Sequence, residues 1–98
     1  MGRRLRRLDP ADLSVIEERG PPGAGETLHV HHRARQVFYV LRGQLTIEVG
    51  LQPHVLESSD SIHVPPGAPH RVHNTGSGEA CFLVISTPTT HGDRTNLE

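Results

Sequence analysis

Apolar residues in this chain occur in short runs that alternate with polar positions and end within about ten residues at a glycine, a proline or a polar cluster. The clearest run is segment 45–51, where every second residue is apolar: Leu45, Ile47, Val49 and Leu51. A period of two is typical of β-strands, because successive side chains point to opposite faces. The 3.6-residue period of an amphipathic helix is hard to find. The pattern therefore predicts an all-β chain.

The same reasoning predicts about eight strands, separated by segments rich in turn-forming residues. Segment 36–50 is expected to form two of them, joined as an antiparallel hairpin by a turn at Gly43. The others are expected at 13–18, 27–31, 54–56, 62–64, 71–74 and 80–86. A closed barrel or a two-sheet sandwich can bury so many strands in 98 residues, whereas an open sheet cannot.

The chain has room for one domain, which we place at residues 11–87. With 3% aromatic residues and no tryptophan, its core is expected to consist mainly of Val, Ile and Leu. A basic N-terminal arm, 1–10, is expected to be solvated, and a docking role for its arginines is the alternative. The polar C-terminal tail, 88–98, is expected to be loose, and we assign no function to its last two residues.

Charge and composition narrow the class of partner. The formal net charge of −1 gives no strong field for nucleic acid or an anionic membrane. No apolar run is long enough to span a bilayer or to form an export signal. The single cysteine, Cys81, lies among core-type residues without a disulfide partner, which indicates a reducing compartment and predicts a cytoplasmic location. We expect a small-molecule ligand or substrate.

The segment 37–41 is apolar on both faces, since Phe38 and Val40 alternate with Val37, Tyr39 and Leu41. A strand of this kind has its outer face covered. Another strand of the same chain could cover it, but so small a domain has few spare layers. A homodimer is therefore the preferred prediction.

Three histidines and a glutamine are candidate residues of a functional site. In a strand, His29 and His31 point to the same face about 7 Å apart and can share one metal ion. Gln36 is in phase with the apolar Phe38, so its amide is expected inside the fold, where it needs a partner. His70 follows a Pro/Gly-rich turn that restricts its backbone. A same-face pair with a third histidine favours a divalent metal site over isolated surface or core histidines.

Two spaced motifs make the chain resemble a small single-domain cupin. The first cupin motif is matched in spacing by Gly23, His29, His31, Gln36 and Gly43. The second is matched by Pro65, Gly67, His70 and Asn74. Two positions depart from the family pattern: Ser59 replaces the opening glycine of the second motif, and Gln36 replaces the usual acidic ligand.

This resemblance implies a jelly-roll β-barrel, the double-stranded β-helix, with one divalent ion per chain, either Fe, Mn, Ni or Zn. It implies that the ion is held by His29, His31, Gln36 and His70. A carboxylate would offset one unit of the metal's charge, whereas an amide oxygen offsets none, so the site is expected to favour anionic ligands. Two alternatives stay open: Gln36 only hydrogen-bonds a neighbour, or the metal site is vestigial.

The resemblance indicates a fold and a site better than a reaction, since cupins include dioxygenases, isomerases, cyclases and non-catalytic binding proteins. The preferred hypothesis is a metal-dependent enzyme acting on a small oxygen-bearing organic molecule. The alternative is a non-catalytic metal-binding or ligand-binding module, such as a sensor.

Four side chains are candidates for the substrate pocket: His32, Phe38, Val40 and Ile47. For the three apolar ones, a plain core position is the alternative. No carboxylate is expected in the cavity, because Glu48 faces outward by alternation and Glu26 lies in a turn. A general base would then have to be His32 or a water on the metal.

Overall fold

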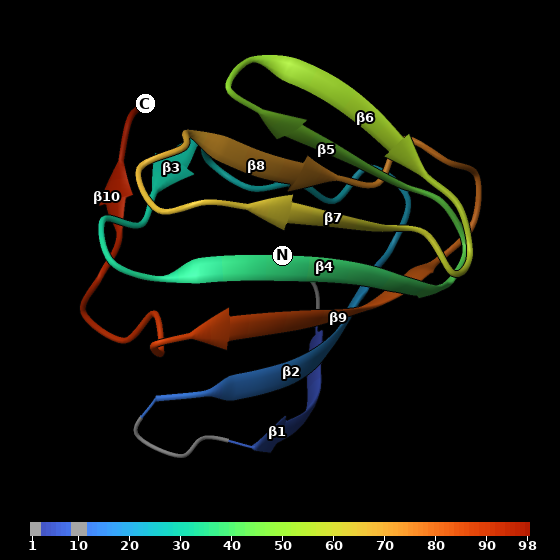
Figure 1. Cartoon of the computed structure of the whole chain (residues 1–98). Coiled ribbons are helices and arrows are strands. Elements are labelled where there is room, and N and C mark those ends of the chain that lie inside the picture. The colour runs from blue at the N-terminus through green and yellow to red at the C-terminus, as the bar shows by residue number, and fades with distance from the viewer. Residues whose placement is uncertain (1–2, 9–11) are drawn as a thin grey trace.

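The computed structural model describes residues 3–8 and 12–98, in which it contains ten β-strands and no helix. The strands are β1 Arg3–Leu8, β2 Ser14–Gly20, β3 His29–Val30, β4 Arg35–Arg42, β5 Leu45–Val49, β6 Gln52–Leu56, β7 Ser61–Val64, β8 His70–His73, β9 Ala80–Thr87 and β10 Thr95–Asn96. They form two antiparallel sheets in the orders β1-β2-β9-β4-β7 and β10-β3-β8-β5-β6 (Figure 1). The predicted all-β jelly roll is confirmed. None of the described residues belongs to a helix that could cross a membrane.

The two strands on either side of Gly43 are present, but they do not pair as a hairpin. β4 lies between β9 and β7 in one sheet, whereas β5 lies between β8 and β6 in the other. The chain crosses between the sheets at Gly43, whose φ is +84° and where a Cβ would collide with the carbonyl oxygen of Glu79. Only glycine tolerates both conditions. The hairpin prediction is wrong. A short turn between two apolar runs has the same sequence pattern whether it joins strands of one sheet or strands of two different sheets.

The interior of the barrel changes character from one end to the other. Along β4 the inward side chains run from Gln36 through Phe38 to Val40, and along β9 the order is reversed, from Phe82 to Ser86. The apolar end is filled by a packed core of Val, Leu, Ile and Phe side chains. The polar end lies at the left of Figure 1, where β3, β10 and the start of β8 meet β4 and β9.

Both ends of the chain take part in the sheets. β1 pairs with β2 at the edge of one sheet, and β10 pairs with β3 at the edge of the other. The backbone N–H of Leu97 donates to the carbonyl of Leu28 at 2.8 Å, and the N–H of Leu28 donates to the carboxylate of Glu98 at 2.8 Å. Residues 3–8 of the predicted arm and 95–96 of the predicted tail are therefore paired in strands, whereas residues 1, 2, 9 and 10 of the arm lie outside the described residues. The domain limits at 11 and 87 stay a prediction.

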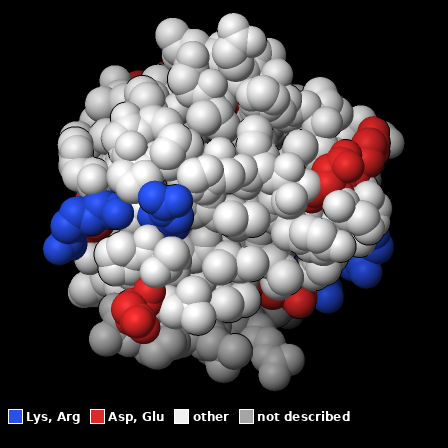
Figure 2. Space-filling model, viewed as in Figure 1, with Lys and Arg blue, Asp and Glu red and all other residues white. Residues whose placement is uncertain are grey.

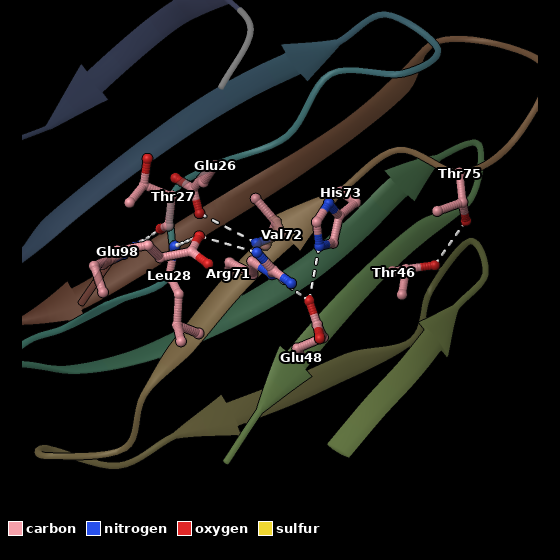
Figure 3. A network of polar contacts seen from close by, with 11 residues as sticks. Glu26, Thr27, Leu28, Thr46, Glu48, Arg71, Val72, His73, Thr75 and Glu98 are labelled. Atoms are coloured by element: carbon pink, nitrogen blue, oxygen red, sulfur yellow. Dashed lines mark hydrogen bonds and ion pairs between the residues drawn. The ribbon is translucent and has the colours of Figure 1, made fainter. Parts of the chain in front are cut away.

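A polar network covers the outer face of the second sheet over β8 and β5 (Figure 3). Arg71 and His73 alternate with the inward side chains of β8, and both donate to Glu48 on β5. Arg71 also reaches the carboxylate of Glu98 at 3.0 Å. The hydrogen bonds from Arg71 and His73 hold the pKa of Glu48 below its usual value. Glu48 therefore faces outward, as the alternation predicts, and Arg71 links the C-terminal segment to β8.

Candidate metal centre

Three histidines meet at the polar end of the barrel. His29 on β3 lies directly opposite His70, the first residue of β8, and His31 follows β3 by one residue. All three side chains are buried, and their ring centroids are 4.4, 5.0 and 5.3 Å apart. One nitrogen from each ring lies within 4.8 Å of the others. This cluster could hold a metal ion.

Hydrogen bonds to the backbone fix the orientation of each ring. The Nδ1–H groups of His29 and His70 donate to carbonyl oxygens two residues earlier in the chain, at 2.7 and 3.0 Å. Nδ1–H of His31 donates to the carbonyl oxygen of Asp93, which is far away in the sequence. A neutral imidazole carries one N–H, so each ring keeps the lone pair on Nε2 for another partner. Backbone bonds of this kind orient histidines for metal binding.

The loops that carry the histidines are joined to one another. The turn before His70 contains Gly67, which has a φ of +83°, and its N–H donates to the carbonyl of His31 at 2.8 Å. The Pro/Gly-rich sequence therefore positions His70 and also braces the loop of His31. This contact joins the two sequence motifs in space.

Burial keeps the rings of His29 and His70 neutral. It lowers the pKa of His29 and His70 from 6.5 to about 4 in each case, although the backbone hydrogen bonds act in the opposite direction. Neighbouring positive charges, including that of Arg94 at His29, also lower the pKa. These two histidines therefore carry no proton on Nε2 near neutral pH and can bind a cation without first losing one.

Gln36 lies between His70 and Ser86. Its Nε2 donates to Oγ of Ser86 at 3.1 Å, and its Oε1 lies 3.0 Å from Nε2 of His70. The proton of the His70 ring is on Nδ1, so the amide oxygen and Nε2 of His70 turn lone pairs toward each other. A cation bound by both atoms removes this repulsion. Rotation of the amide, which would present its N–H to His70, removes it as well.

A cavity of about 390 Å³ adjoins the histidines. His29, His31 and Gln36 form part of its wall. Four hydroxyl groups also line it, from Ser14, Ser86, Thr89 and Thr90. The size suits a small ligand, and the lining offers many hydrogen-bonding groups.

The predicted pocket residues occupy different places. Phe38 lines the cavity. Val40 and Ile47 are instead fully buried in the packed core, and His32 is exposed with its Nε2 3.1 Å from Oγ1 of Thr95. Alternation along a strand predicts which face a side chain occupies, but not how deep along the barrel it lies. Val40, two residues after Phe38 on β4, already lies in the packed core.

Two carboxylates line the cavity that was expected to have none. Glu18 shares the inner face of β2 with Ser14 and Ile16, and Glu26 lies in the segment before β3. Glu26 accepts a hydrogen bond from the backbone N–H of Val72 at 3.2 Å. The expectation is therefore wrong. The period of two along β2 was a sufficient signal for Glu18, whereas the place of Glu26 depends on contacts distant in the sequence.

The C-terminal segment contributes a wall that the sequence did not reveal. Residues 89–92 and Arg94 line the cavity, and Asp93 anchors them. The Asp93 carboxylate accepts hydrogen bonds from the N–H groups of His32, Arg33 and Ala34 at 2.9 to 3.0 Å. Burial alone would raise the pKa of Asp93, but these donors outweigh it and hold the pKa below its usual value. No sequence signal links residue 93 to residues 31–34.

Comparison with known protein families identifies the family that this fold and site belong to. Residues 17–86 match the cupin domain family, which covers both histidine motifs. The chain belongs to the cupin family. Its three buried histidines lie at the positions expected from the motifs of that family, and the glutamine takes the place of the acidic residue.

This cupin has relatives with different descriptions. It is 29% identical over 86 residues to an uncharacterized protein of Methanocaldococcus jannaschii, covering 87% of this chain and 69% of that protein. It is 28% identical over 78 residues to the HTH-type transcriptional regulator PuuR of Escherichia coli, covering 80% of this chain but 42% of the regulator. A solved sugar phosphate isomerase of the cupin superfamily from Silicibacter pomeroyi superimposes with a TM-score of 0.73 at 27% identity, covering 80% of this chain and 52% of that one. These similarities identify a family, not a reaction.

Proposed function

We propose that this cupin is a metal-dependent enzyme that acts on a small oxygen-bearing organic molecule. One divalent ion would be held by His29, His31 and His70, with Gln36 as a fourth ligand. The observation that carries the proposal is the convergence of three buried imidazoles, each with Nδ1–H bonded to a backbone carbonyl, beside a cavity that His29 and His31 line. A bound ion supplies Lewis-acid polarisation of a substrate oxygen.

The lining of the cavity favours proton transfer over oxygen activation. Glu18 and Glu26 offer carboxylates that can accept or return a proton, and the hydroxyl groups can orient a hydroxylated substrate. Phe38 and Val84 add an apolar wall that excludes water from part of the cavity. The similarity to a sugar phosphate isomerase also supports an isomerase-type reaction. Manganese, nickel or zinc suits such chemistry, whereas iron would suit a dioxygenase.

A sensor is the second candidate, because one relative is a transcriptional regulator. The residues described by the structure contain no helix, so the helix-turn-helix part of such a regulator has no counterpart in them. Proton exchange would separate the two functions. An isomerase should transfer deuterium from heavy water into a sugar phosphate substrate and should lose this activity in Glu18→Gln or Glu26→Gln. A sensor should bind ligands saturably without product.

Metal binding is tested with chelator-treated protein titrated with Zn²⁺ by calorimetry. We expect one ion per chain, and at a hundredfold excess over Kd a gain of about 2.7 kcal/mol in the free energy of unfolding. His70→Ala should abolish this gain. His63→Ala, on the exposed side of β7, is the matched control and should bind zinc like the wild type. Absence of stoichiometric binding in the wild type would refute the proposal.

The same titration decides the role of Gln36. If its amide oxygen binds the ion, Gln36→Ala should weaken zinc affinity while circular dichroism shows an intact fold. Unchanged affinity would remove Gln36 from the ligand set and leave it as the hydrogen-bonding partner of Ser86.

The metal used in the cell requires elemental analysis of protein purified from its native host, because a histidine cluster takes up metals from expression media and nickel columns. Cys81 is buried with a free thiol, which supports our proposal of a reducing location such as the cytoplasm.

A further inference from the structure

Arg94 brings a positive charge to the cavity from outside the cupin motifs. It lines the cavity together with His29 and His31, but it lies beyond residues 17–86 that match the family. Arg94 therefore brings a cationic side chain to the cavity from a segment outside the family match.

The guanidinium of Arg94 has N–H donors that are available to a ligand. Its Nε donates to Oδ1 of Asn96 at 2.9 Å, which orients the group. No carboxylate among residues 12–98 forms an ion pair with Arg94. The four N–H groups on its two Nη atoms can therefore serve a ligand. A guanidinium in this state is a ready partner for a carboxylate or phosphate, which it binds with two parallel hydrogen bonds.

The backbone that carries Arg94 is held in place. The neighbouring Asp93 accepts three backbone hydrogen bonds from residues 32–34, and its own N–H donates to the carbonyl of Thr90 at 2.9 Å. On the other side, Thr95 and Asn96 pair with β3. Because the backbone of the segment is fixed before a ligand arrives, little backbone entropy is lost on binding.

The side chains that would hold the ion carry no negative charge of their own. The histidines and Gln36 are neutral ligands, so a bound divalent ion keeps its charge, and Arg94 adds a second positive group. Glu18 and Glu26 also line the cavity, and the backbone N–H of Val72 donates to Glu26. An anionic group is therefore favoured next to Arg94 and disfavoured next to the two carboxylates.

We propose that Arg94 recognises the anionic group of the substrate, a carboxylate or a phosphate, while uncharged oxygen atoms of the same molecule face the histidine cluster. The substrate is thus a small organic anion that fits the cavity of about 390 Å³. This inference rests on the proposed function for the location of the reacting end. The binding of the anion to Arg94 is measurable without the metal.

Calorimetric titration of zinc-loaded and metal-free protein tests the inference. Malonate and phosphoglycolate are the anionic probes, and malonamide is the uncharged counterpart. Both forms of the wild type should bind at least one of the anions more tightly than malonamide. Arg94→Gln should weaken anion binding about tenfold to a hundredfold. Arg94→Lys should weaken it by less, because a lysine keeps the charge but cannot form two parallel hydrogen bonds.

Arg42→Gln is the matched control, since it removes the same charge from the last residue of β4, at the end of that strand away from Gln36. Arg42 lies there 3.6 Å from Glu79. It should bind both anions as the wild type does. Preference for malonate would identify a carboxylate substrate, and preference for phosphoglycolate a phosphorylated one. The inference is overturned if Arg94→Gln binds the anions as tightly as the wild type, if Arg42→Gln weakens binding equally, or if neither anion binds.

The two proposals can fail separately. If no zinc binds, the metal-dependent function is wrong, and the comparison of Arg94→Gln with wild type in metal-free protein still decides whether Arg94 binds anions. If zinc binds but anion affinity is the same in Arg94→Gln and wild type, the proposed metal centre is supported and the proposed anion site is refuted.

Discussion

The protonation state of single imidazole rings controls what this site can bind. His29 and His70 have their pKa lowered to about 4 by burial, while the same residues titrate near 6.5 when the chain is unfolded. Each ring uses its one N–H to hold a backbone carbonyl, so protonation adds a second N–H where a ligand atom is needed. Acid and metal ions therefore compete for the same lone pairs.

The metal-free protein should lose stability in mild acid. Between pH 6.5 and about 4, the unfolded chain binds more protons at His29 and His70 than the folded chain does. Stability from these two groups is therefore fully present above about pH 6.5 and falls as pH drops toward 4. Urea denaturation across this range measures the effect. His70→Gln should flatten the profile and the exposed-site variant His63→Gln should not; a wild-type profile without a decline would contradict the lowered pKa of the two buried rings.

Among the structural elements, the C-terminal segment has the largest effect on the site for its length. It supplies part of the cavity wall, the carbonyl that holds His31 and the carboxylate that binds three N–H groups in residues 32–34. A single loop thereby positions a histidine, a pocket wall and Arg94. Asp93 is the residue through which these roles are linked.

Asp93→Ala should weaken zinc affinity roughly tenfold to a hundredfold, because the loop that orients His31 loses its anchor. Hydrogen exchange at the N–H groups of residues 32–34 should increase in the same variant. Asp93→Asn should lie between, since an amide keeps one acceptor oxygen.

Asp60→Ala provides the control for this prediction. Asp60 also accepts a backbone N–H bond, from Glu57 at 2.9 Å, but it does so in a turn outside the cavity lining. It should leave zinc affinity unchanged. Equal zinc affinity in Asp93→Ala and wild type would show that His31 does not need this anchor.

For the whole molecule, the outer face of the sheet containing β4 is the surface most suited to a second copy. Val15, Ile85 and Val37 are register neighbours on three adjacent strands, and Tyr39 pairs with Leu83 beside them. All five are half-buried and point away from the core. Figure 2 shows that, in the view of Figure 1, the centre of the molecular surface carries no charged side chain. We propose that two chains associate through the apolar side chains of this face.

Sedimentation velocity tests the dimer, which remains a prediction. Wild type should sediment as a dimer, and Ile85→Glu should shift it to the monomer, because a charge would be buried in the middle of the apolar row. Val55→Glu, on the exposed strand β6, places the same charge elsewhere and should leave the dimer intact. Sedimentation of the wild type as a monomer at all concentrations would reject this interface.

Part of the site could be predicted because it depends on local periodicity. The period of two places His29 and His31 on one face and Gln36 in phase with Phe38, and the restricted turn presents His70; the structure has these four side chains buried within one region. Two outcomes could not be read in this way. Whether β4 and β5 share a sheet, and whether Val40 lies in the cavity or the core, depend on which strands pair and how deep they lie.

The amino-acid sequence by itself determined most of the β-strands, the family and three histidines able to meet at one point, because each depends on residue types at short, fixed spacings. Tertiary structure alone decided that Asp93 would anchor the loop of His31, that Arg94 and Glu26 would line the cavity, and that the polar tail would become a pocket wall. Those contacts join residues about sixty positions apart, as in His31 with Asp93. They exist only after the two sheets have packed, so no local pattern records them.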